Sequence, residues 1–177
     1  MTVRYVLLGT ICLLVGRLAH AAITVEVSGG NRWAHDSGYA HQEPTSAIWQ
    51  IALSKQISNQ LLMGLAYQSG GTLRARHYSL DERSYQFFFQ PLFSPQNKWQ
   101  PLARLGFSYW DVDKHEPKHT LIHRRGFSPL MELGARYQLS HSLSVGLRFQ
   151  YIYSVGDSKT GEYDSQALLL GLGYQWK

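Results

Sequence analysis

The chain has 177 residues, a formal net charge of +5 and one cysteine, Cys12. A single cysteine excludes an internal disulfide, and so mild a positive charge gives no case for nucleic acid as a partner. The length suits one domain.

The first residues have the pattern of an export signal. Arg4 supplies a positive charge, residues 6–15 form an apolar run, and Ala19-His20-Ala21 fits a small-x-small cleavage site. The run is too short to span a bilayer as a helix, which takes about 20 residues. We therefore expect residues 1–21 to be a signal peptide and 22–177 to form the mature domain. Loss of Arg4 and Arg17 lowers the net charge from +5 to +3.

After residue 21, eight short stretches alternate apolar and polar residues, which is typical of β-strands. Their connections alternate between short turns and longer polar segments, such as 31–44, 111–125 and 156–165. This asymmetry is typical of outer-membrane barrels, in which short turns face the periplasm and long loops face outward. The predicted strands are 23–28, 47–54, 61–67, 85–89, 103–109, 131–137, 143–153 and 166–177.

The last of these stretches is the most informative. Leu168, Leu170, Leu172, Tyr174 and Trp176 share one face, while small and polar residues share the other. A strand that faces lipid requires an apolar outer face with aromatic residues at its end. A soluble barrel of the lipocalin type also alternates, but its apolar face points inward. We therefore predict an all-β, eight-stranded antiparallel up-and-down transmembrane β-barrel in the outer membrane of a Gram-negative bacterium.

Residues 128–157 carry a family resemblance. They contain Ser128-Pro129, Gly134-x-x-Tyr137, a turn before Leu143, Gln150 followed by an aromatic, and Gly156-Asp157. In these features the chain resembles the OmpA-like transmembrane β-barrel family. The resemblance implies an ionic plug inside the barrel and recognition of the closing-strand aromatics by the barrel assembly machinery. The family's periplasmic peptidoglycan-binding domain has no counterpart in this sequence, so we expect no tethering to the cell wall.

Five charged residues fall on the predicted inner face. An eight-stranded barrel is just wide enough for side chains to fill it, and charges enclosed there must be paired. We therefore expect a filled interior rather than a broad pore. Because Arg136 stands where the resembled family has a carboxylate, the pairings of that family cannot be transferred. The residues are Glu26, Arg104, Glu132, Arg136 and Arg148.

A basic, histidine-bearing rim is expected on the external loops. Such a rim could contact lipopolysaccharide, glycans or a host surface, more strongly below the ordinary histidine pKa near 6.5. An ordinary solvated loop surface explains the same residues equally well. The contact candidates are His115, His119, His123, Arg74, Arg76, Arg124 and Arg125.

Two catalytic patterns in the sequence compete with this surface role. Residues 115–119 match H-E-x-x-H, but Pro117 disrupts the helix that this zinc motif needs. His77-Tyr78-Ser79, near Asp81 and Glu82, could serve a lipid A-modifying hydrolase, yet the Asn-Ala extension of the deacylase family is absent. We predict a non-enzymatic, monomeric protein for surface contact, adhesion or envelope integrity, without metal or cofactor. A deacylase-like enzyme is the alternative and a pore the third choice.

Overall fold

The computed structural model describes residues 22–35, 44–75, 78–93, 97–115, 121–158 and 160–176. The expected signal peptide, residues 1–21, lies outside the described residues. None of the described segments is a helix long and apolar enough to cross a membrane. The described strands are β1 (Ile23–His35), β2 (Thr45–Ser58), β3 (Leu61–Gly70), β4 (Leu73–Ala75), β5 (Tyr78–Pro91), β6 (Trp99–His115), β7 (Leu121–Gln138), β8 (Leu143–Val155) and β9 (Tyr163–Trp176).

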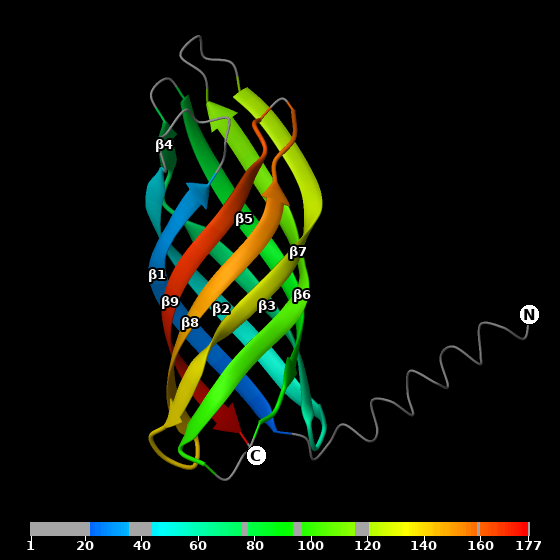
Figure 1. Cartoon of the computed structure of the whole chain (residues 1–177), viewed down its shortest axis with the longest axis vertical. Helices are drawn as coiled ribbons and strands as arrows, with labels where there is room; N and C mark the ends of the chain where they lie inside the picture. The colour runs from blue at the N-terminus through cyan, green and yellow to red at the C-terminus, as the bar shows by residue number, and fades with distance from the viewer. Residues whose placement is uncertain are drawn as a thin grey trace, which may run out of the picture.

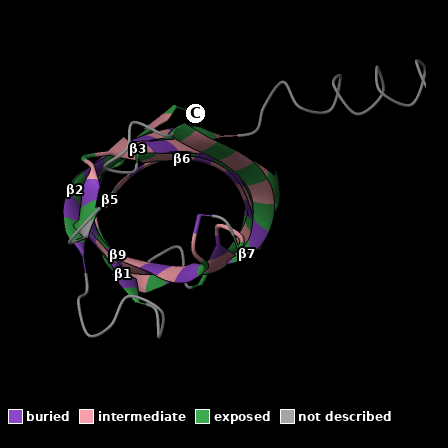
Figure 2. Cartoon of the chain, turned by 90° about the horizontal axis from the view of Figure 1, so that it is seen from above, coloured by how far each residue is buried: buried purple, intermediate pink, exposed green. Residues whose placement is uncertain are grey.

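Eight of these strands close into a barrel. The sheet order is β3-β2-β1-β9-β8-β7-β6-β5-β4, all pairings are antiparallel, and a further β3–β5 pairing closes the ring. The three-residue β4 pairs with β5 near one end. Figure 1 shows the strands tilted around the barrel axis, and Figure 2 shows the closed ring from above. The predicted eight-stranded antiparallel barrel is confirmed.

Burial alternates along the strands because neighbouring side chains point to opposite faces (Figure 2). The exposed face of the central part is apolar: Leu65, Leu105, Phe107 and Leu170 are each about 60 % exposed. Each of the eight barrel strands carries large apolar side chains on its outer face, and such a surface requires an apolar surrounding such as lipid. This arrangement is the reverse of a lipocalin, as expected from the sequence.

Aromatic side chains lie toward both ends of this apolar band. Near the end where β1 begins and β9 ends, Trp99 packs on Tyr137, and Tyr174 on Trp176. Toward the opposite end, outward-facing aromatics line up across four neighbouring strands, with ring centroids 5.2 Å apart for Tyr67–Tyr85 and 4.9 Å for Tyr109–Phe127. Aromatics at both edges mark the two membrane–water interfaces. Short turns of outer-membrane barrels face the periplasm, and the turns 59–60 and 139–142 lie at the end where β1 begins, so this end is assigned as periplasmic and the other as external.

The strands extend further at the external end than the sequence predicted. Residues 31–35 continue β1, and residues 111–115 and 121–125 continue β6 and β7, where polar loops were expected. There the strands still alternate, but apolar side chains now face inward and polar ones outward. Ala34 and Val112 are fully buried inside, while Asp113 and Arg125 point outward. A wall that projects beyond the lipid has water outside, so its polar residues belong outside. Reading polarity as a loop signal was therefore wrong here.

The interior has two layers. Toward the external end lies a cluster of buried apolar side chains, which includes Leu80, Trp110, Val112 and Tyr163. The Nε1 of Trp110 donates a hydrogen bond to Ser128 Oγ at 2.8 Å. A side chain at Gly126 would collide with the Trp110 ring. Deeper in the barrel most of the buried residues are polar or charged, and the buried Phe88 packs its ring against the Arg104 guanidinium. Both layers fill the lumen with side chains.

Candidate functional site

The deeper layer is an ionic network centred on Glu26. Arg104 Nη2 lies 2.8 Å and Arg136 Nη2 3.4 Å from Glu26 Oε2, while Arg148 Nη1 contacts Oε1. The three arginines come from β6, β7 and β8, so they reach Glu26 on β1 from across the barrel. Their side chains are at most 12 % exposed. One carboxylate therefore receives three guanidinium groups in a space shielded from water.

Glu132 is the second anionic centre. Arg104 Nη1 and Arg148 Nε each lie 3.0 Å from Glu132 Oε2, and Gln150 Nε2 donates to Oε1 at 2.7 Å. Further polar side chains extend the network: Gln50 donates to Gln86 at 2.8 Å. Since all five residues predicted to face inward take part in one network, this layer ties together strands from around the ring and obstructs the lumen.

A separate buried ion pair lies nearer the external end. Arg32 Nη1 is 2.6 Å from Glu82 Oε2, both side chains are 1 % exposed, and Tyr163 donates its hydroxyl to the same oxygen at 2.8 Å. Sequence reasoning missed this pair, because Arg32 fell in a predicted loop and Glu82 among candidate catalytic residues. Counting the period-two alternation onward from Glu26 would have placed Arg32 inside.

The external wall carries charged residues on its outer face, just beyond the aromatics. In register across β5, β6 and β7 lie Arg83, Asp111 and Arg125, and one step further out Asp81, Asp113 and His123. Each row is two residues beyond the one before, about 7 Å along a strand. The wall thus presents both signs of charge where lipid headgroups end.

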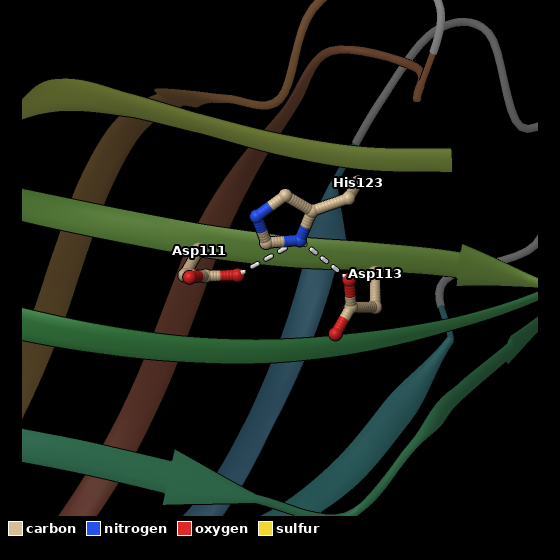
Figure 3. A group of neighbouring side chains, drawn as sticks. All are labelled: Asp111, Asp113 and His123. Carbon is tan, nitrogen blue, oxygen red and sulfur yellow. Dashed lines mark hydrogen bonds and ion pairs between the residues drawn. The ribbon is translucent and has the colours of Figure 1, made fainter. Parts of the chain in front are cut away.

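Most cations of this wall already have a carboxylate partner. Arg125 Nε donates to Asp111 Oδ2 at 2.8 Å, which raises the pKa of Arg125 above its ordinary value. His123 Nδ1 lies 2.7 Å from Asp113 Oδ1 and 3.4 Å from Asp111 Oδ1 (Figure 3). The external surface of β6 and β7 is therefore a mixed ionic surface rather than a purely basic rim.

Residues 56–177 match the family model of the OmpA-like transmembrane domain. The chain belongs to this family. A comparison with curated proteins gives no match. The OmpA-like chain is an outer-membrane β-barrel protein, and its fold and closed strand order agree with that assignment.

Solved structures of small outer-membrane barrels share the fold. Neisserial surface protein A has a TM-score of 0.75 at 14 % identity, with 88 % of this chain and 99 % of that chain covered. Ail, the attachment invasion locus protein of Yersinia pestis, was solved in complex with the heparin analogue sucrose octasulfate. It has a TM-score of 0.61 at 12 % identity, with 88 % of this chain and 99 % of that chain covered. The N-terminal barrel domain of OprF from Pseudomonas aeruginosa has a TM-score of 0.63 at 12 % identity, with 88 % of this chain and 97 % of that chain covered.

In this OmpA-like barrel the five predicted contact residues that the structure describes lie on strands rather than loops. His115 and His123 are exposed on β6 and β7, Arg125 faces outward, and Arg124 Nε pairs with Asp157 Oδ2 at 3.0 Å. Arg74 is exposed on β4. Strand positions fix these side chains more firmly than loops would. His119 and Arg76 lie outside the described residues.

The residues considered for a hydrolase are not assembled as the sequence suggested. Glu82 points into the barrel toward Arg32, and His77 lies outside the described residues. Asp81 Oδ1 accepts the Thr72 hydroxyl at 2.6 Å. The register does bring Ser79 opposite His115, whose Nε2 is 3.5 Å from Asp81 Oδ2.

Proposed function

We propose that this outer-membrane barrel is a non-enzymatic surface protein whose external wall binds anionic polysaccharide. The supporting observation is a pair of arginines on one face: within the described residues, Arg74 and Arg83 are exposed and have no ion-pair partner. The partners of Arg74 and Leu73 on β5 are Ser79 and the fully buried Leu80, so Arg74 shares the outward face of β5 with Arg83. Exposed guanidinium groups bind sulfates and phosphates with paired N–H donors.

The filled interior favours a surface role over a channel. Ionic and apolar layers occupy the lumen, so contact with the surroundings falls to the external end. Ail, which shares this fold, was crystallised with a heparin analogue, and that supports a glycan as the class of ligand. Arg124 and Arg125 on β7 are already paired with carboxylates. Arg74 and Arg83 are therefore better candidates for binding an anionic ligand.

The test is binding of sucrose octasulfate to the folded barrel in detergent micelles, measured by titration calorimetry. Replacing Arg74 and Arg83 together by glutamine should weaken binding about fivefold or more, since each exposed ion pair contributes up to about 1 kcal/mol. Added salt should weaken the wild-type interaction as well. The matched control is Lys98→Gln, which removes an exposed cation at the periplasmic end. Equal binding by the double variant, or an equal loss in the control, would contradict the proposal.

A lipid A-modifying hydrolase is the second candidate, favoured by the placing of Ser79, His115 and Asp81 together on the external wall. A serine beside a histidine that a carboxylate orients is the arrangement of an activated nucleophile. Under the surface-protein proposal, overexpression leaves the mass spectrum of lipid A unchanged. Loss of an acyl chain that disappears with Ser79→Ala would establish the enzyme instead.

A further inference from the structure

The side chains of Asp111, Asp113 and His123 converge on one point of the external wall (Figure 3). One possible ligand atom from each residue lies within 4.8 Å of the other two. We propose that these three residues bind a divalent transition-metal ion of the zinc class. This inference concerns a different set of residues from the proposed glycan contact and stands independently of it.

The distances suit a metal with little rearrangement. In a tetrahedral zinc site with bonds near 2.0–2.2 Å, ligand atoms are about 3.3 Å apart. His123 Nδ1 is 3.4 Å from Asp111 Oδ1 and 2.7 Å from Asp113 Oδ1. The Asp113 contact has to open by about 0.6 Å, and a side chain 31 % exposed has room to do so. The ligand oxygens of Asp111 and Asp113 lie within 4.8 Å of each other.

The local charge provides a second, independent reason. Asp81 on β5 lies directly opposite Asp113 on β6, and Asp111 is on the same outward face. Like charges directly opposite each other destabilise a sheet. Arg125 forms an ion pair with Asp111. A divalent cation held at His123 would relieve the repulsion between these carboxylates.

The groups around the site hold its ligands in place. Arg125 Nε binds Asp111 Oδ2, which leaves Oδ1 of the same carboxylate directed at His123. Arg124 Nη1 donates to the main-chain oxygen of His123 at 2.8 Å, and its Nε reaches Asp157. Partners that orient the ligands in this way are typical of metal sites. The three ligands also sit on one continuous antiparallel pair, β6–β7, which fixes their spacing.

The ligand types select the class of metal. One imidazole nitrogen with two carboxylate oxygens suits zinc and related ions, whereas calcium and magnesium prefer oxygen alone. Three protein ligands leave a fourth tetrahedral position. The ligand side chains are 24–43 % exposed, so that position is accessible to water from outside the barrel.

The test is titration of Zn²⁺ into the full, folded barrel in detergent micelles, by calorimetry in a buffer that does not bind zinc. We expect saturable binding of one ion per chain. His123→Ala and Asp113→Asn should each weaken it about tenfold or more, because even the loss of an orienting partner costs about that much. Co²⁺ should give visible absorption bands that these two variants lose. Heat-dependent gel mobility verifies that each variant is folded.

Two matched controls define the site. His141→Ala, in the exposed periplasmic turn, and His115→Ala, on the same wall but outside the trio, should change zinc affinity by no more than about twofold. Absence of saturable binding by the wild type would overturn the proposal. So would undiminished binding by folded His123→Ala, or a loss in His115→Ala as large as that in His123→Ala.

Discussion

Replacing Glu26 by glutamine should lower the free energy of unfolding by about 3–5 kcal/mol, because it removes a buried carboxylate and leaves its arginine partners buried. In the native barrel Glu26 receives Arg104, Arg136 and Arg148. The substitution keeps the shape and one acceptor oxygen but leaves three guanidinium groups with Glu132 as their carboxylate. Charges so poorly exposed to water cannot be compensated by solvation.

Unfolding by guanidinium chloride in detergent micelles, followed by tryptophan fluorescence, measures this effect. The matched control is Glu162→Gln, which removes an exposed carboxylate that accepts a hydrogen bond from Ser154 and should cost at most about 0.5 kcal/mol. Adding Arg136→Gln to Glu26→Gln should recover part of the loss by removing one uncompensated cation. A Glu26→Gln barrel as stable as the Glu162→Gln control would show that the network is not the main electrostatic support.

The period-two pattern assigns these residues to the inner face for a physical reason. In the middle of the bilayer the outside is uniformly apolar, so every polar residue on a strand must point inward. Glu26, Arg104 and Arg148 could therefore be placed inside without knowing the register. Which arginine meets which carboxylate depends on how strands from opposite sides of the barrel are staggered, and no local pattern encodes that.

The same rule failed beyond the membrane. Where the wall leaves the lipid, polarity no longer distinguishes the outside of a strand from a loop. Residues 111–115 and 121–125 were misassigned for this reason. The trio of Asp111, Asp113 and His123 was missed with them. Its members are brought together by the β6–β7 register, which pairs Asp113 with His123 across ten residues of sequence. Only an extended hairpin, and not a loop, produces that contact.

The buried pair of Arg32 and Glu82 should behave as a coupled unit in a double-mutant cycle. Arg32→Met and Glu82→Gln should each cost about 3–5 kcal/mol, because each leaves its partner buried without its counter-charge. The double variant should cost clearly less than the sum, with a coupling free energy of about 2 kcal/mol or more. Glutamine at position 82 keeps an acceptor for the Tyr163 hydroxyl, so the cycle isolates the charge from that hydrogen bond.

An exposed pair of the same type provides the matched comparison. Arg125 and Asp111 lie 2.8 Å apart, but their side chains are 56 % and 24 % exposed. The cycle of Arg125→Met and Asp111→Asn should give a coupling of at most about 1 kcal/mol, since water screens the two charges. Equal couplings for the two pairs would contradict the assignment of Arg32 and Glu82 to the barrel interior. A large coupling for Arg32 and Glu82 alone would show that the projecting wall encloses a water-poor core beyond the membrane, which explains why its strands persist there.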